Sequence, residues 1–396
     1  MLQSLWKQSP SKSEDLQYKT FKPDPEDLPP NWEFYDYKAA GIDVGCIRAH
    51  AKGEPKSKIT LISGFKANIK TYNTPQIRAL QKIGIEIDII LLPDPGKKIG
   101  YLQDNKEIAK QVLTHNPPPD SVRSNIPHFI FGHSLGGRAF IANMRDEEFA
   151  QEILENYTGA VLIAPHFSSP YRSRPLVNAI YSSYCKMFAE KSYGDAPLDW
   201  TMSAANKFKE MIKSGGKDET RGEVYQQRSR ATYSPITTDN TATTHGQILY
   251  SNQEGEDLWQ RIQDKGVPDA AKEFPMIMMG GSKDFVSCQN YIRNVAEAFD
   301  AEFYEFDTYH HPFLESKRAR KLILNLMQKT TDNWQNMNVP TDNALIRAAK
   351  RATGVFKEFL SGHKLGIFTS PNSDDMGISS LHHGPNYNKD ENTPEA

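Results

Sequence analysis

The sequence predicts an α/β protein built on a mostly parallel, doubly wound sheet. Three observations carry this prediction. Short apolar runs alternate with helix-like stretches over most of the chain. One apolar run leads through a glycine-rich turn, residues 132–137, directly into a helical stretch. The chain has 396 residues, 38% of them apolar, which is enough for one large core and an insertion.

Seven runs have the length and composition of buried strands. They span residues 42–51, 59–63, 85–92, 128–131, 160–164, 276–279 and 301–306. Several are continuously apolar rather than alternating, which is typical of strands buried on both faces of a parallel sheet. Helical spacing occurs between them, at residues 73–83, 104–113, 136–144, 291–299 and 318–328. Right-handed crossovers through these helices would give the doubly wound arrangement.

The chain divides into five regions. We expect an extended N-terminal arm (1–40), a core in two pieces (41–165 and 267–330), an inserted helical lid (166–266), a C-terminal helical extension (331–361) and a disordered tail (362–396). The arm is rich in proline between residues 22 and 32, which disfavours regular structure. The lid interrupts the alternation because it has no strong buried strand. The tail is too polar to pack a core.

Composition narrows the class of function. Lys and Arg total 47 and Asp and Glu total 49, so the net charge is close to zero. No overall electrostatic field would therefore attract the chain to nucleic acid. Cys46, Cys185 and Cys288 are scattered and lack the spacing of a zinc site. We therefore expect no metal, no cofactor and no nucleic-acid partner. No apolar leader or membrane-length run is present, which favours a cytoplasmic protein.

The glycine-rich turn predicts a nucleophile. Residues 126–131 are strand-like, and they run into Gly132-His133-Ser134-Leu135-Gly136 and then a helix, which is the context that GxSxG requires. A chance occurrence of the pattern is the alternative, and the matching strand and helix disfavour it. Glycines at both ends leave room for a strained turn with Ser134 at its apex. His133 is expected to pack or to form hydrogen bonds, because its position aims it away from the hydroxyl.

A serine nucleophile needs a base, and the base needs an orienting carboxylate. Asp284 follows the strand at 276–279 in a loop where catalytic groups of open α/β sheets gather. After the next strand come His310 and His311, in a loop at the same edge. A turn aspartate and a surface histidine pair would explain each signal alone, but the order Ser, Asp, His is demanding. The residues themselves do not decide between the two histidines, although Pro312 restricts His311.

Two backbone amides are candidates for the oxyanion hole. The Leu135 amide lies at the start of the helix after Ser134, where N–H groups can face a developing oxyanion. The loop after the strand at 59–63 should supply the second donor, and there Gly64 permits a close approach. We predict that this donor is the Phe65 amide.

With these motifs in place, residues 43–327 resemble the α/β-hydrolase superfamily, and most closely its lysophospholipase and monoacylglycerol lipase group. The elbow Gly132–Gly137 and Asp284 match that group, and His310 followed by Glu315 is similar to its histidine loop, which favours His310 over His311. The chain departs from the group in its oxyanion loop, which begins Ser63-Gly64 instead of His-Gly. It also has Pro93-Asp94-Pro95-Gly96 in place of an Asp-x-Arg-Gly turn, which weakens any inference about substrate.

The resemblance implies a serine hydrolase that cleaves a small acyl ester, such as a lysophospholipid or a monoacylglycerol, through a Ser134–His310–Asp284 triad. The same residues would also serve an acyltransferase, a thioesterase or an amidase. A non-catalytic hydrolase-like binding protein is the third reading, and the complete residue set argues against it. Aromatic residues of the lid would line an acyl pocket or simply form the lid's own core. Oligomeric state is left open.

One amphipathic stretch raises the question of membrane contact. Residues 343–360 place apolar side chains near helical spacing with Arg and Lys among them. A basic amphipathic helix binds membrane surfaces, but such a stripe more often docks on its own domain. We therefore treat weak peripheral membrane contact as the less favoured expectation.

Overall fold

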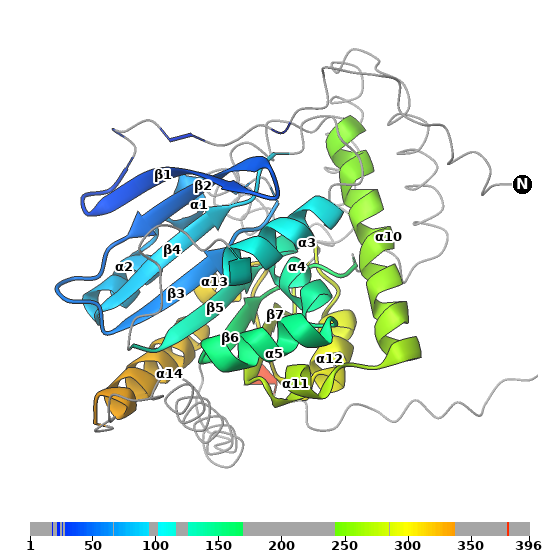
Figure 1. The fold of residues 1–396 in the computed structure, drawn as a ribbon. Coiled ribbons are helices and arrows are strands. Elements are labelled where there is room, and N and C mark those ends of the chain that lie inside the picture. The colour runs from blue at the N-terminus through cyan, green and yellow to red at the C-terminus, as the bar shows by residue number, and fades with distance from the viewer. Residues whose placement is uncertain are drawn as a thin grey trace, which may run out of the picture.

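The computed structural model describes residues 18, 22–23, 26, 28–65, 67–94, 102–115, 126–168, 242–284, 286–336 and 378–379. One nine-stranded sheet runs through these ranges (Figure 1). Its strands are β1 (Trp32–Ala39), β2 (Ile42–Ala49), β3 (Ser57–Ile62), β4 (Ile85–Leu91), β5 (His128–His133), β6 (Gly159–Ile163), β7 (Met276–Gly281), β8 (Glu302–Phe306) and the two-residue β9 (Ile378–Ser379). All seven strands that the apolar runs predict are present.

The strand order across the sheet is β1-β2-β4-β3-β5-β6-β7-β8-β9. Neighbours from β4 to β8 are parallel, whereas β1 with β2, β2 with β4 and β8 with β9 are antiparallel. Strands β1 to β8 thus have the order of the α/β-hydrolase fold. The predicted fold class, a mostly parallel doubly wound sheet, is confirmed.

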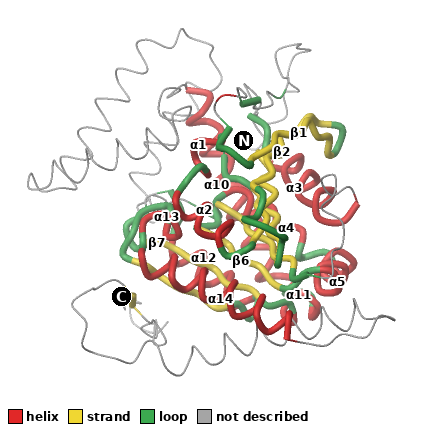
Figure 2. Tube along the Cα trace, turned by 90° about the vertical axis from the view of Figure 1, so that its left-hand side faces the viewer, coloured by secondary structure: helices red, strands yellow, loops and turns green. Residues whose placement is uncertain are grey.

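Helices cover both faces of the sheet. They are α1 (Ile69–Tyr72), α2 (Pro75–Lys82), α3 (Leu102–Lys110) with a π-helical turn (Gln111–His115), α4 (Leu135–Asn143), α5 (Glu147–Asn156), α10 (Ala242–Lys265), α11 (Asp269–Glu273), α12 (Gln289–Ala298), α13 (Pro312–Glu315) and α14 (Lys317–Asn336). Helices α3, α4, α5, α10, α11 and α12 pack on one face, and α1, α2, α13 and α14 on the other (Figures 1 and 2).

Strand β6 is apolar throughout because both of its faces are covered. Every residue of β6 is buried, and its side chains alternate between the two hydrophobic layers. Val161 and Ile163 belong to the layer under α2 and α14, whereas Ala160 and Leu162 belong to the layer under α3 and α4. This double burial produces the unbroken apolar runs that the sequence shows.

Strand β1 lies within residues 1–40, for which the sequence predicts an extended arm. It pairs with β2 through all eight of its residues. Ala40 and Gly41 connect the two strands with φ of 56° and 72°, the double left-handed geometry of a tight hairpin turn. Polar residues interrupt β1 because it is an edge strand, and the proline run just before it obscured its start.

Three of the expected regions fall largely outside the described residues. Of the expected lid, residues 169–241 are not described, while residues 242–265 form helix α10. Of the expected C-terminal extension, residues 331–336 complete α14, and residues 337–361, with the amphipathic stretch 343–360, lie outside. Of the tail, only Ile378 and Ser379 are described. No helix in the described ranges is long and apolar enough to cross a membrane.

Candidate active site

Ser134 lies at a sharp turn between β5 and α4. Its backbone has φ 51° and ψ −112°, a combination that costs a non-glycine residue about 1–3 kcal/mol. The turn exists because its flanking residues are glycines. A Cβ on Gly136 would lie 2.3 Å from the Ile62 carbonyl oxygen, and one on Gly132 would lie 2.6 Å from the Gly137 Cα. A side chain at position 132 or 136 would therefore collide with neighbouring backbone, as the sequence pattern predicts.

Three of the predicted site residues form one hydrogen-bonded chain. His310 Nε2 lies 2.9 Å from Ser134 Oγ, although the two residues are 176 positions apart in sequence. His310 Nδ1 lies 2.8 Å from Asp284 Oδ2. All three side chains are buried, and the Asp284 carboxyl is fully enclosed. Nδ1 donates to the carboxylate, so Nε2 is left to accept the serine proton.

The second carboxylate oxygen of Asp284 is held by backbone amides. Oδ1 accepts hydrogen bonds from Val286 N at 2.7 Å and from Ser287 N at 3.0 Å. With the imidazole on Oδ2, the carboxylate has three hydrogen-bond donors. These bonds fix the orientation of the carboxylate toward His310.

The loops that carry Asp284 and His310 are joined through their backbones. Lys283 N donates to Thr308 O at 2.9 Å, and Ser282 N donates to Phe306 O at 2.8 Å. The contact requires glycine at 281, where a Cβ would lie 1.9 Å from the Tyr309 carbonyl oxygen. The acid and the histidine are therefore positioned relative to each other before any substrate binds.

His311 has different surroundings from His310. Its ring centroid lies 4.4 Å from that of His133, and burial lowers the pKa of His311 to about 3. It is His310 whose ring nitrogens contact both Ser134 and Asp284. Glu315 supports the same loop, because its Oε2 accepts a hydrogen bond from Tyr309 N at 2.7 Å, and burial raises the pKa of Glu315.

The loop predicted to supply an oxyanion donor packs directly against the elbow. Tyr72 Oη accepts a hydrogen bond from Gly64 N at 3.1 Å and lies 3.1 Å from His133 Nδ1. A Cβ on Gly64 would lie 3.1 Å from the Cβ of Ser134. Phe65 follows Gly64 in this loop, and Leu135 is the first residue of α4. Both predicted amides therefore lie on the segments that meet at Ser134.

His133 is a hydrogen-bonding residue, as its position predicts. Burial, with smaller contributions from His311 and His310, lowers its pKa well below the usual value. A neutral His133 accepts a hydrogen bond at Nδ1 from the Tyr72 hydroxyl. Because His133 and His311 both stay neutral, they place no positive charge beside His310.

Sequence reasoning missed three buried polar residues around the site: Tyr72, Arg138 and His166. Each is more than 90% buried. Arg138 follows the elbow on α4, and its guanidinium donates to the carbonyl oxygen of Ser251 on α10 and, at 2.7 Å, to Ser251 Oγ. No spacing rule marks such residues. For Arg138 the sequence did hold one signal, because it is the only charged residue in the helix after the elbow.

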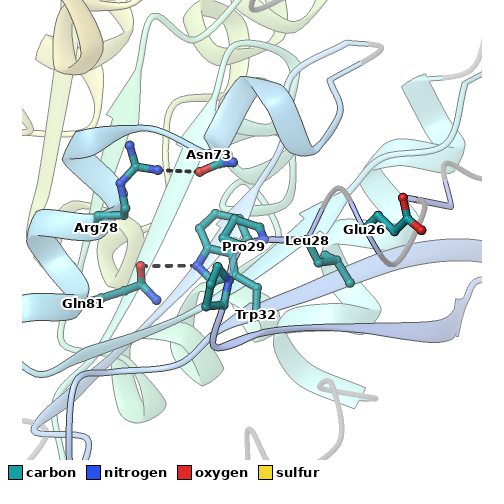
Figure 3. Close-up of a pocket in the computed structure, with 8 residues that line it drawn as sticks. Glu26, Leu28, Pro29, Trp32, Asn73, Arg78 and Gln81 are labelled. Atoms are coloured by element: carbon teal, nitrogen blue, oxygen red, sulfur yellow. Dashed lines mark hydrogen bonds between the residues drawn. The ribbon is translucent and has the colours of Figure 1, made fainter.

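Other parts of the described structure do not offer a competing site. No group of three or more His, Cys, Asp or Glu side chains in the described ranges has the geometry to hold a metal ion. A surface cavity of about 600 Å³ lies between the segment before β1 and helix α2 (Figure 3). Four of its polar side chains are bonded in two pairs, Trp32 Nε1 to Gln81 Oε1 at 3.3 Å and Arg78 to Asn73 at 2.6 Å. It lacks a nucleophile with an adjacent base.

Comparison with known proteins gives structural likeness only. No protein-family model matches the chain, and no curated protein sequence matches it. A soluble variant of monoglyceride lipase from Saccharomyces cerevisiae is 15% identical, with a TM-score of 0.47 over 79% of this chain and 100% of that one. A Nitrososphaera gargenis carboxylesterase structure is 16% identical, with a TM-score of 0.47 over 76% and 99%. Monoacylglycerol lipase from Paleococcus ferrophilus is 16% identical, with a TM-score of 0.42 over 75% and 98%.

Proposed function

We propose that the chain is a serine hydrolase that cleaves a carboxylic ester through an acyl-enzyme, with Ser134 as nucleophile, His310 as base and Asp284 as the orienting acid. One observation carries the proposal. A serine on a strained strand-to-helix turn lies 2.9 Å from an imidazole nitrogen, and the other nitrogen of that ring lies 2.8 Å from a buried carboxylate.

The reaction proceeds in two halves. Ser134 Oγ attacks the ester carbonyl carbon while its proton moves to His310 Nε2, and the Phe65 and Leu135 amides bind the oxygen that becomes negative. The alcohol leaves with the proton from His310, and Ser134 keeps the acyl group. Water then attacks the acyl-enzyme, giving its proton to His310, and the carboxylic acid is released as Ser134 regains a proton. Asp284 stabilises the imidazolium in both halves.

The substrate class that we propose is a lysophospholipid or a monoacylglycerol. The support for it is the sequence resemblance at the elbow, the acid and the histidine loop. Acyl transfer and the cleavage of thioesters or amides use the same three side chains, so the leaving group has to be measured. Hydrolysis of monoacylglycerol and lysophosphatidylcholine, compared with matched thioester and amide substrates, separates these reactions.

A fluorophosphonate probe with mass spectrometry tests the nucleophile. We expect a single adduct on Ser134 and turnover of nitrophenyl esters, both abolished in Ser134→Ala with the fold retained. Ser282→Ala is the matched control, because Ser282 is an exposed serine at the same edge of the sheet. A folded native protein with neither label nor turnover would contradict the proposal and favour a non-catalytic binding protein.

A further inference from the structure

His166 connects three parts of the molecule that meet beside Ser134. It lies after β6, and only 6% of its surface is exposed. Its backbone N–H donates to the carbonyl oxygen of Ser134 at 3.0 Å. Its imidazole Nδ1 lies 3.4 Å from Ser287 Oγ. The ring also interacts with the Val286 backbone and with the Asn252 side chain of α10.

The contact with Ser287 leads directly to the acid. Ser287 donates its backbone N–H to Asp284 Oδ1 at 3.0 Å, and its hydroxyl donates to the Ala164 carbonyl oxygen at 3.3 Å. His166 therefore contacts the residue that carries the nucleophile and a residue that orients the acid. His166 is hydrogen bonded directly to Ser134 through its backbone N–H, and Ser287 links its side chain to Asp284.

Helix α10 is seated against the same segment. A Cβ on Gly255 would lie 1.6 Å from the Phe167 carbonyl oxygen, so the two backbones touch. Ser168 Oγ donates to Glu256 Oε1 at 2.9 Å. Together with the bonds from Arg138 to Ser251, these contacts attach residues 251–256 to the chain beside the elbow.

The His166 side chain acts through hydrogen bonds rather than charge. Burial lowers the pKa of His166 well below the usual value, and the nearby positive charge of Arg138 lowers it further. A neutral ring has one donor and one acceptor, and here its neighbours are an α10 side chain and the loop after Asp284. Displacing α10 would remove Asn252 as a partner of the ring and weaken the contact of the ring with Ser287.

We propose that His166 is a positioning residue that couples the seating of helix α10 to the placement of Ser134 and Asp284. This inference rests on the proposed function. It makes α10, whose residues lie outside the Ser134–His310–Asp284 chain, a determinant of how fast the nucleophile reacts. Substrate binding is not the property that it controls.

The test uses three variants of the full chain and one control. His166→Phe keeps a ring but removes its hydrogen bonds, His166→Gln restores polar atoms, and Asn252→Leu removes only the α10 partner. Asn105→Leu is the matched control, because Asn105 is an equally buried asparagine on α3. Fluorophosphonate labelling rates, kcat and KM for a nitrophenyl ester, and amide hydrogen exchange are measured for each.

We expect His166→Phe to lower kcat and the labelling rate by about 10- to 100-fold with KM within about twofold, since misplacement at a catalytic centre has effects of this size. Asn252→Leu should lower the same two rates by a smaller factor, and His166→Gln should recover most of the loss. A further variant that combines His166→Phe with Asn252→Leu should lose less activity than the two single losses multiplied together. Hydrogen exchange in residues 251–256 should be faster in His166→Phe than in native protein.

Native rates in a folded His166→Phe would overturn the proposal, as would an Asn252→Leu variant that behaves like Asn105→Leu. If His166→Phe does not fold, Asn252→Leu and His166→Gln decide the question. Failure of the proposed function is distinguishable, because in that case the native protein itself is not labelled, and both proposals fall together.

Discussion

Two buried polar clusters lie on one sheet, and they are assembled in different ways. Ser134, His310 and Asp284 come from loops after the carboxyl ends of β5, β8 and β7. The charged cluster, Arg48, Lys58, Glu86 and Asp88, lies on the strands themselves, toward the amino ends of β3 and β4.

The charged cluster follows from strand register. Arg48 faces Asp88 across β2 and β4, and Lys58 faces Glu86 across β3 and β4. Arg48 Nε lies 2.7 Å from Asp88 Oδ1, and Lys58 Nζ lies 3.0 Å from Glu86 Oε1. Once the sheet forms, these pairs form with it. The proposed catalytic cluster depends instead on strained backbone and on glycine contacts between loops. Damage to the first should therefore unfold the protein, and damage to the second should inactivate a folded one.

The largest effect should come from replacing each of the two neighbouring histidines separately. His310→Gln removes the group bonded to Ser134, so kcat should fall by about 10⁴-fold or more. His311→Gln should cost less than about tenfold, because the His311 ring packs on His133 instead. Ester turnover by purified, folded variants measures both. The opposite ranking would make His311 the base.

Breaking the charged cluster should give the reverse pattern. Asp88→Ala leaves Arg48 buried without its bidentate partner, which costs about 3–5 kcal/mol of unfolding free energy. Urea denaturation measures the loss, and kcat/KM per folded molecule should stay near the native value. The paired change of Arg48→Met with Asp88→Leu should recover much of the stability. A stable but inactive Asp88→Ala would contradict the distinction between the two clusters.

Gly281→Ala tests whether loop contact positions the acid and the histidine. The added Cβ meets the Tyr309 carbonyl, so the two loops must separate, and a shift of about 1 Å at a catalytic centre can lower kcat about 100-fold. Gly53→Ala is the control, since a Cβ there would have no neighbour within 4 Å among the described residues, even though the φ of Gly53 is unsuited to alanine. Equal activity of the two variants would show that the loops adjust freely.

The smallest effect concerns Glu254 on α10. Burial raises the pKa of Glu254 to about 7, against the opposing charge of Arg138. The folded-state pKa lies above the unfolded value near 4.5, so the stability that this group contributes is complete below about pH 4.5 and is lost as pH rises to about 7. Glu254→Gln should therefore flatten the pH dependence and raise Tm at pH 8 by about 1–3 °C relative to native protein.

Differential scanning calorimetry at pH 5 and pH 8 measures this change, with Glu273→Gln as an exposed control. An identical pH dependence in native protein and in Glu254→Gln would show that Glu254 does not titrate in the docked helix.

The strands and the proposed nucleophile were predictable from sequence for two physical reasons. Double burial makes strands continuously apolar, and the elbow needs glycines at fixed positions around Ser134. By contrast, β1 is an edge strand with polar residues and no such signal. Tyr72, Arg138 and His166 were missed because a buried polar side chain is defined by its partners, which lie far away in sequence. The choice between His310 and His311 likewise depends on which ring the fold turns toward Ser134.

The parallel pairing of β6 with β7 has a consequence for how this protein can change. Ile163 and Met279 are register partners, yet residues 164–275 separate β6 from β7. The entropy of closing a loop grows only logarithmically with its length, by about 0.6 kcal/mol for each doubling. Loop entropy therefore sets no tight limit on the length of this connection, whereas residues 166–168 and helix α10 within it are fixed by their contacts beside the elbow. Laboratory evolution of new specificity would best begin with insertions that leave those contacts in place.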